Sequence, residues 1–181
     1  MQERFGIPYE PISYPYGVTG VKEVYSALGR HLEVEYQTEC QEIERSAAEG
    51  ASKVYPYLQA LYGMPAAVIG SGGRADGMRR FLEQELGMEV VCFCRREELR
   101  DLEDFFMLAR QSEAALLFGS SFELELAEEL GIPLIRYDYP VFDEISLTGN
   151  PFVGAVGILS LLESILNSVM QTPSLKGALY Q

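Results

Sequence analysis

The sequence predicts an α/β protein with a Rossmann-like or flavodoxin-like parallel sheet, helices on both of its faces, and a helical segment before it. From Pro65 onward, short apolar stretches alternate with helical patterns of about ten residues or more, which is typical of parallel strands joined by crossover helices. Before Pro65 the chain is first rich in proline and then helical in pattern. We therefore expect an extended and helical segment at 1–62, a Rossmann-like α/β domain at 63–150, and a C-terminal helix at 151–181 that packs back on them.

The first part is predicted to be extended and then helical. Three prolines disfavour helix at their own positions and at the residues before them: Pro8, Pro11 and Pro15. Residues 19–32 then predict a helix with Thr19 as a possible cap. Its apolar face would contain Val21, Val24, Tyr25, Leu28 and Leu32. Residues 34–63 predict a long helix that is weak at Gly50 and kinks or restarts at Pro56.

The second and third parts are predicted to contain the sheet and the last helix. We expect strands at 66–71, 88–94, 114–120 and 133–139. We expect the helices between them at 77–87, 96–112 and 122–131. An irregular crossing at 140–150 leads to a last helix at 151–171. Its apolar positions extend almost all the way round, so it should pack on several neighbours.

Composition excludes several classes of function. The 181 residues include 27 acidic and 14 basic side chains, which give a net charge of -13. Nucleic acids and anionic membranes attract clustered Lys and Arg, so we expect no nucleic-acid partner and no membrane partner. No apolar run approaches the about 20 residues of a membrane span, and no signal peptide opens the sequence. We therefore expect a cytoplasmic protein with three reduced cysteines, Cys40, Cys92 and Cys94.

The best candidate for ligand binding is the turn after the first strand, within 68–77. Its glycines allow a backbone to approach a ligand closely, the following helix N-terminus favours an anion, and an arginine adds positive charge. The candidate cofactor-binding residues are Gly70, Ser71, Gly72, Gly73 and Arg74. The spacing matches neither the G-x-G-x-x-G dinucleotide pattern nor a P-loop with its Lys, so a tight strand-to-helix turn is the alternative.

A second turn, Gly119-Ser120-Ser121, has the residue types of a nucleophile loop. It lacks the flanking glycines of G-x-S-x-G, and nothing places His31, the only histidine, beside it. Ser120 and Glu123 fit the S-x-x-E capping box. We therefore predict a helix start here and no catalytic residue.

Two pairs of side chains are considered as further sites. Cys92 and Cys94 lie two apart, and a lone C-x-C without a nearby histidine is a weak metal signal. We expect both to pack as small hydrophobic side chains and predict no metal ligand. Asp138 and Asp143 flank the crossing, where they could do acid–base chemistry, although turn hydrogen bonding is the commoner role.

The order of several motifs is more specific than any one of them. The passage "YPYGVTGVKEVYSALGRHL" at 14–32 looks like a P-x-G-x-x-x-T-x-x-F-L-x-x-L passage. "YDYPVFD" at 137–143 matches a G-F-P-x-F-D crossing with Tyr139 in place of its Phe. "FVGA" at 152–155 stands near a G-Y-x-G-A opening of an apolar helix. This order, over about residues 8–171, resembles the C-terminal region of nitrogenase component 1 type oxidoreductases, in particular their β-type or cofactor-assembly-type subunit.

The resemblance implies a scaffold for a metallocluster or substrate cavity at a subunit interface. It implies a paired homologous subunit, an ATP-driven iron–sulfur reductase as electron donor, and an iron–sulfur or molybdenum–iron cluster in the full-length complex. The family's cluster cysteines lie in an N-terminal domain that would precede this chain, and the α-type cofactor histidine has no match, because residues 32–181 contain no His. We therefore expect a fragment that binds no cofactor by itself.

The resemblance also bears on the candidate ligand turn. Gly72-Gly73-Arg74 loosely resembles a Gly-Gly-x-Arg turn that lies beside the metal cofactor in the α-type subunit. The alternative function is a stand-alone Rossmann-like module that binds a small anionic or metal-chelate ligand at 70–74.

Overall fold

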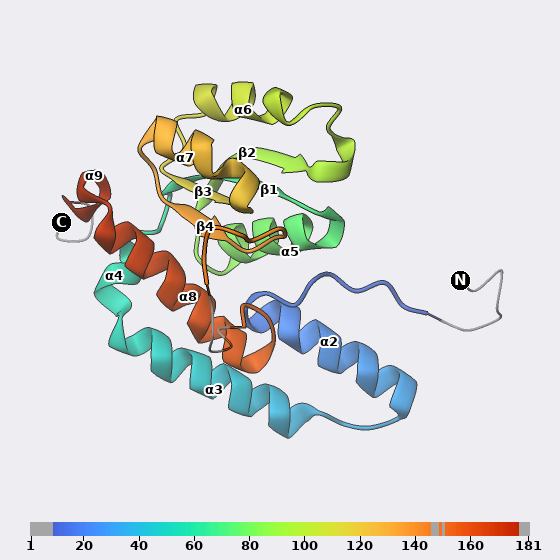
Figure 1. Ribbon diagram of the computed structural model, residues 1–181. Helices are drawn as coiled ribbons and strands as arrows, with labels where there is room; N and C mark the ends of the chain where they lie inside the picture. Colours follow the sequence, from blue (N-terminus) through green and yellow to red (C-terminus); the bar gives the residue numbers. More distant parts are fainter. Residues whose placement is uncertain (1–8, 146–148, 150, 178–181) are drawn as a thin grey trace.

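A computed structural model describes residues 9–145, 149 and 151–177 (Figure 1). These residues form a four-stranded parallel sheet with helices on both faces, which confirms the predicted fold class.

The elements before the sheet are α2 (Gly17–Leu32), α3 (Gln37–Lys53) and α4 (Tyr55–Gln59). The sheet region contains β1 (Pro65–Gly70), α5 (Gly72–Gln84), β2 (Glu89–Arg95), η1 (Arg96–Glu98), α6 (Leu102–Gln111), β3 (Leu116–Gly119), η2 (Ser121–Glu123), α7 (Leu124–Leu130) and β4 (Leu134–Arg136). The last elements are α8 (Gly154–Gln171) and α9 (Pro173–Lys176). The predicted features at Pro8 and at part of the crossing, 146–148 and 150, lie outside the described residues.

The strand order is β2-β1-β3-β4, and each neighbouring pair is parallel. This is the order of flavodoxin-like sheets. In the central pair, three consecutive residues of β1 face three of β3: Ala66, Ala67 and Val68 opposite Leu116, Leu117 and Phe118. β4 is shorter than the predicted strand at 133–139, because the chain turns at its end. There, the backbone N–H groups of Tyr137 and Asp138 both donate to the carbonyl of Gly119, at 3.0 Å each.

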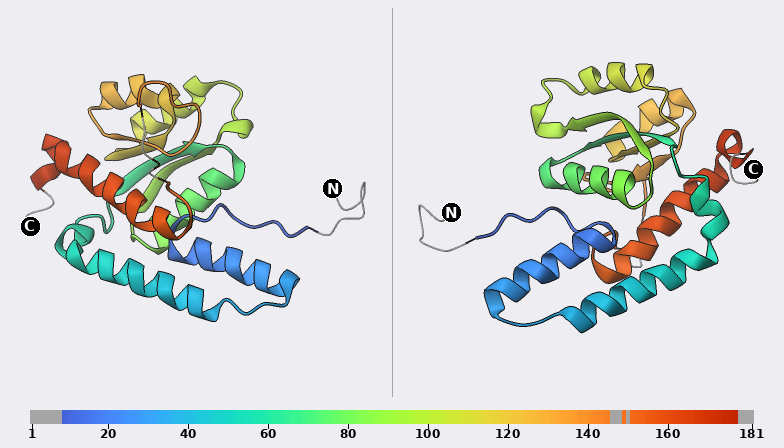
Figure 2. Two further views of the ribbon diagram at one scale, coloured as in Figure 1. Left: turned by 60° about the horizontal axis from the view of Figure 1, so that its bottom comes forward. Right: turned by 180° about the vertical axis from the view of Figure 1, so that it is seen from behind.

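Both faces of the sheet are buried, because successive strand residues point to opposite sides. One face packs against α5 and α8 through apolar side chains that include Val68, Phe118, Met78, Leu82, Leu161 and Ile165. The other face packs against α6 and α7 through side chains that include Ala67, Ile69, Leu117, Phe105 and Leu126. Figure 2 shows these layers from two further sides, with α2 and α3 in an outer layer against α8.

The helical segment before the sheet agrees with the prediction in type and differs at its start. Pro56 lies in the first turn of α4, where the missing N–H costs little, so the predicted restart is confirmed. The prediction of Thr19 as the cap of α2 is wrong, because the helix begins at Gly17. Its first N–H groups are satisfied instead from another element: Glu85 accepts hydrogen bonds from the backbone of Val18 and Thr19, both at 2.8 Å.

The last helix packs on several neighbours as predicted, but it begins at Gly154 and not at 151. The apolar residues of α8 do not surround it but form one broad buried face: Gly157, Ile158, Leu161, Leu162, Ile165, Leu166 and Val169. This face packs on α2, α3 and β4. By length and a mean hydropathy of 1.3, α8 would be able to cross a membrane, but a helix of a protein core meets the same criteria. Most side chains on the remaining side of the helix are polar, although Val156 is also exposed there.

We predict opposite effects of alanine at two glycines of α5. A Cβ at Gly77 would lie 2.6 Å from the backbone oxygen of Tyr14, whereas a Cβ at Gly73 would meet nothing within 4 Å. Gly77→Ala should lower the free energy of unfolding by about 1–3 kcal/mol through overpacking. Gly73→Ala should raise it by about 0.5–1 kcal/mol, because Ala favours helix over Gly. Urea unfolding followed by circular dichroism measures both, and equal effects would contradict the close approach at Gly77.

Candidate functional site

The carboxyl ends of β1, β3 and β4 meet where the order of the strands reverses. β1 connects through α5 to β2 on one side, and β3 connects through α7 to β4 on the other. Such a reversal opens a crevice between neighbouring strands, and ligands of open parallel sheets commonly bind in it. In this protein the crevice lies between Gly70, the last residue of β1, and Gly119, the last residue of β3.

The crevice is filled by the protein's own side chains. The hydroxyl of Tyr137 donates a hydrogen bond to the carbonyl of Ile69 at 3.0 Å, and a Cβ at Gly70 would collide with that hydroxyl. A Cβ at Gly119 would lie 2.6 Å from Oε2 of Glu123. Burial raises the pKa of Tyr137 well above its usual value, so the phenol stays neutral. The two glycines therefore make room for a tyrosine and a glutamate of the same chain.

Asp138 follows Tyr137 and is only 1% exposed. Its Oδ2 accepts hydrogen bonds from the backbone N–H and the hydroxyl of Ser71, both at 2.8 Å. Its Oδ1 accepts a hydrogen bond from Nη1 of Arg74 at 3.2 Å. A buried carboxylate requires such partners. Asp138 therefore ties the end of β4 to the turn between β1 and α5.

Glu123 is a second buried carboxylate, with no exposed surface. Its Oε2 accepts hydrogen bonds from the backbone N–H and the hydroxyl of Ser120, at 2.7 and 2.9 Å. Ser120 and Glu123 form a capping box at the start of η2, which confirms the predicted helix start. Arg96 donates to both oxygens of Glu123, at 3.0 and 3.1 Å, and its Nε lies 3.9 Å from Oδ2 of Asp138. One guanidinium thus lies between the two buried carboxylates.

The predicted ligand turn is shorter than expected, because α5 already begins at Gly72. Its backbone donors face carboxylates of the protein: the N–H of Ser71 faces Asp138, and the N–H of Gly72 donates to Glu97 at 3.0 Å. That bond lowers the pKa of Glu97. Of the five predicted residues, Arg74 lines a cavity between the carboxyl edge of the sheet and α8. Cofactor binding by Gly70, Ser71, Gly72, Gly73 and Arg74 stays a prediction.

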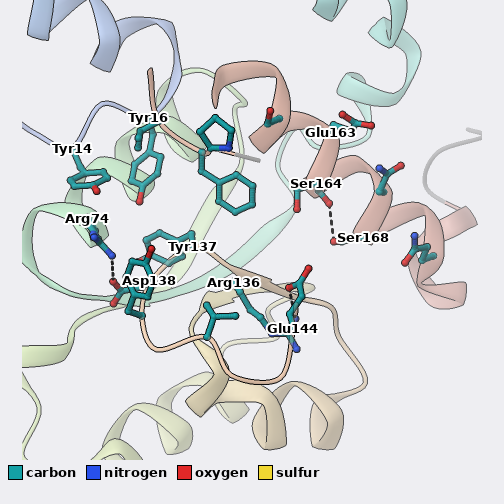
Figure 3. Close-up of a pocket in the computed structure, with 18 residues that line it drawn as sticks. Tyr14, Tyr16, Arg74, Arg136, Tyr137, Asp138, Glu144, Glu163, Ser164 and Ser168 are labelled. Atoms are coloured by element: carbon teal, nitrogen blue, oxygen red, sulfur yellow. Dashed lines mark hydrogen bonds and ion pairs between the residues drawn. The ribbon is translucent and has the colours of Figure 1, made fainter. Parts of the chain in front are cut away.

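A cavity of about 810 Å³ lies between the carboxyl edge of the sheet, the segment before α2, and α8 (Figure 3). Its wall on the sheet side is aromatic and contains Tyr14, Tyr16, Tyr137 and Tyr139. Arg74 stands in this wall with its guanidinium 5.0 Å from the ring centre of Tyr14 and 4.9 Å from that of Tyr139. Two rings and the Asp138 carboxylate therefore hold Arg74 in one orientation.

The opposite wall is a polar stripe on α8, which the sequence analysis missed. Its residues recur at intervals of three and four along the helix: Ser160, Glu163, Ser164, Asn167, Ser168 and Gln171. Residues with this spacing share one face of a helix. Figure 3 shows Glu163, Ser164 and Ser168 on the side of α8 that borders the cavity. The sequence therefore already indicated this stripe, because polar residues recur every three or four positions within an otherwise apolar helix.

Asp143 lies in the loop after β4 and supports the edge of the cavity. Nε of Arg136 donates to its two carboxylate oxygens at 2.9 and 3.0 Å, and the hydroxyl of Ser121 also bonds to it. These bonds, above all those of Arg136, lower the pKa of Asp143 to about 2. Both Asp138 and Asp143 are thus ion-paired, as expected for structural hydrogen bonding rather than acid–base chemistry.

The cysteines lie away from the cavity. Cys92 is buried against the α6 and α7 side of the sheet with Cys94 packed beside it, which confirms their predicted packing. Burial raises the pKa of the Cys92 thiol to about 11. Within the residues that the structure describes, no group of three or more His, Cys, Asp and Glu side chains is arranged to hold a metal ion.

These features define an open parallel α/β domain with a closed switch-point crevice and a polar cavity beside it. A family model described as "Nitrogenase component 1 type Oxidoreductase" matches residues 1–170. The chain belongs to this family, which confirms the resemblance found in the sequence. A solved structure described as "Nitrogenase Cp1 at pH 6.5" has the same fold, with a TM-score of 0.76 at 20% identity over 93% of this chain and 41% of that one.

Curated relatives carry names from two enzyme systems. The nitrogenase molybdenum-iron protein beta chain of Methanococcus maripaludis is 25% identical over 197 residues, and that of Methanothermobacter marburgensis is 29% identical over 204 residues. Each match covers 94% of this chain and 41% of the relative. A subunit of the light-independent protochlorophyllide reductase of Physcomitrium patens is 25% identical, over 93% of this chain and 38% of that protein. The chain thus spans about two-fifths of the length of these relatives.

We predict that Glu123→Gln destabilises the protein far more than Glu125→Gln. The first change leaves the largely buried Arg96 without its carboxylate, whereas Glu125 is exposed on α7. The expected loss of unfolding free energy is about 2–4 kcal/mol for Glu123→Gln and below about 0.5 kcal/mol for Glu125→Gln. Chemical denaturation of the two matched variants measures this difference. A loss below about 0.5 kcal/mol for both would contradict the buried ion pair.

We also predict a contribution of Asp143 to acid stability. Because the pKa of Asp143 is lower in the folded protein than in the unfolded chain, its stabilising effect is fully present above about pH 4. It is lost as the pH falls from about 4 to about 2, where the unfolded chain binds a proton more readily. Asp143→Asn should therefore flatten the fall in unfolding free energy over this window, as measured by denaturation at several pH values. An unchanged slope would contradict the ion pair with Arg136.

Proposed function

We propose that this chain forms part of a substrate cavity at a subunit interface in an oxidoreductase of the nitrogenase component 1 type. The observation that carries the proposal is the polar cavity of about 810 Å³ between the carboxyl edge of the sheet and α8. Membership of the family supports the class of reaction. The chain covers about two-fifths of its relatives, so other protein parts would complete the cavity at its open side.

In this proposal the protein works in a cytoplasmic complex. A paired homologous subunit meets this chain at an interface, and an ATP-driven iron–sulfur protein delivers the electrons. The names of the relatives support an assembly of several chains, because one is named as a beta chain and another as a subunit of a reductase.

A metallocluster of iron–sulfur or molybdenum–iron type belongs to the full-length complex in this proposal and not to this chain. Iron–sulfur clusters are held by cysteine thiolates, and among the residues that the structure describes, neither a cysteine nor a histidine lines the cavity. The described cysteines, Cys92 and Cys94 on β2 and Cys40 on α3, lie on other elements. The donor set therefore does not fit ligation of a cluster, and we assign no cluster ligand to this chain.

The cavity residues would bind and orient a polar molecule. Arg74 presents guanidinium N–H donors that are already fixed by Asp138 and two tyrosine rings, so binding costs little side-chain entropy. The hydroxyl and amide groups of α8 offer donors and acceptors on the other side. Phe152 and Val153 add apolar surface. Such a mixed lining is usual for sites that take small organic molecules.

The alternative function is a stand-alone module that binds a small anionic or metal-chelate ligand at 70–74. Arg74 supports it, because its guanidinium lines the cavity. The backbone donors of Ser71 and Gly72 support it less, because Asp138 and Glu97 already accept their hydrogen bonds. An anion would have to displace these two carboxylates.

We predict that the isolated chain binds no stoichiometric cluster, because its cavity offers no thiolate. After anaerobic incubation with iron and sulfide and removal of the excess, the iron content should be far below one cluster per chain, without an EPR signal on reduction. The tagged protein, purified anaerobically from its own cells, should retain a second protein of the same family. A stoichiometric cluster on the isolated chain, or reduction of a substrate by it alone, would refute this proposal.

The same preparation distinguishes the alternative. Thermal shifts are measured with nucleotides, homocitrate-like acids and metal chelates for the unchanged protein, Arg74→Ala and Arg79→Ala. Arg79 is a matched control, because it lies on the same helix and pairs with Glu83 at the surface. A ligand that stabilises the unchanged protein and Arg79→Ala but not Arg74→Ala would favour the stand-alone binding module.

A further inference from the structure

Large hydrophobic side chains gather on the loop after β4 and on the neighbouring turn. They are Phe122, Tyr139, Val141, Phe142 and Ile145, which we call the aromatic platform. Exposure reaches 68% for Phe142 and 87% for Ile145. The rings of Phe122 and Phe142 contact each other edge to face, with centroids 6.1 Å apart. Large apolar side chains that stay exposed close together commonly mark an interaction site.

The backbone that carries the platform is held firmly. The N–H of Ser121 donates to the carbonyl of Pro140 at 2.9 Å, and the N–H of Phe142 donates to the hydroxyl of Ser121 at 3.0 Å. Asp143, the next residue, is ion-paired with Arg136. The apolar side chains therefore stay exposed on an ordered loop. An ordered apolar surface loses little conformational entropy on binding.

The charges around the platform decide the kind of partner. Arg74, Arg96 and Arg136 lie beside or beneath it, and each pairs with a carboxylate, those of Asp138, Glu123 and Asp143 respectively. Three positive charges are thus offset by three negative charges. Glu144, on the same loop and 61% exposed in its side chain, lies 3.8 Å from Arg136, which already pairs with Asp143. The four carboxylates therefore exceed the three guanidinium groups by one negative charge. A complementary surface would carry positive charge at its rim.

A second copy of the chain is a poor partner on the same grounds. Each copy carries a net charge of -13, so two copies repel each other. The surplus carboxylate of Glu144 would also face a copy of itself in a symmetric contact. Charge complementarity therefore favours a different, basic protein surface over self-association.

We propose that the aromatic platform is a docking surface for a protein partner whose contact patch is apolar at its centre and carries Lys or Arg at its rim. Phe122 and Phe142 are the central anchors, because paired aromatic side chains at the centre of an interface commonly contribute most of the affinity. Glu144 provides the electrostatic contact at the rim. The proposal does not depend on the redox role of the family, since its test measures binding alone.

The test uses the 181-residue chain and a labelled amphipathic helical peptide with leucines on one face and lysines on both flanks. Fluorescence anisotropy should show binding that weakens as salt is added. Phe142→Ala should weaken binding by about tenfold or more, and Glu144→Gln by about two- to fivefold. Val156→Ala is the matched control, because Val156 is 71% exposed but lies on α8, and it should change binding by less than about twofold.

Three results would overturn the proposal. The first is equal binding of the same peptide with glutamates in place of its lysines. The second is binding of the lysine peptide that Phe142→Ala leaves unchanged while the variant keeps the unfolding midpoint of the original protein. The third is self-association in analytical ultracentrifugation that Phe142→Ala abolishes, which would identify a second copy as the occupant.

Discussion

Two carboxylates buried at the carboxyl ends of the strands set the geometry of this protein. An ionised Asp or Glu loses its hydration on burial, and this is costly unless guanidinium groups and N–H donors replace the water. Asp138 and Glu123 obtain these donors from three separate turns: Ser71 and Arg74 after β1, Arg96 after β2, and Ser120 after β3. The ends of β1, β2, β3 and β4 are therefore held together by polar contacts in addition to the apolar core. The same contacts occupy the place where open parallel sheets commonly bind ligands.

This arrangement moves the available binding surface away from the crevice. Tyr137 and Glu123 fill the space above Gly70 and Gly119, and the open cavity lies to one side, against the polar stripe of α8. Arg74 joins the two regions, because it pairs with Asp138 and also stands in the cavity wall. The fold of the nitrogenase component 1 type is thus combined with a binding surface that offers hydroxyl, amide and guanidinium groups but no thiolate.

Local patterns in the sequence were sufficient for the fold class, most element positions and the capping box of Ser120 and Glu123, because strand alternation, helix period and caps depend on neighbouring residues. They were insufficient for the buried network, because Asp138 and Ser71 are 67 positions apart and their contact exists only once the strand order is known. For the same reason, local patterns did not show that Asp138 and Glu97 accept the backbone hydrogen bonds of the turn after Gly70. The polar residues of α8 recur every three or four positions in the sequence, but the high apolar content of the helix made this pattern easy to overlook.

The apolar face predicted for α2 is only partly buried. Leu28 and Leu32 have the spacing of a buried face but are exposed, because periodicity does not show which part of a face another element covers.

The contacts of Asp138 predict that it is energetically coupled to Arg74 across the switch point. A double-mutant cycle of Asp138→Asn and Arg74→Gln, measured by chemical denaturation, tests it most directly. The surface pair Arg79 and Glu83 serves as the control and should show a coupling energy below about 0.5 kcal/mol. For Asp138 and Arg74 we expect a coupling energy of about 1–3 kcal/mol. Effects of the two changes that simply add, within about 0.5 kcal/mol, would contradict the account.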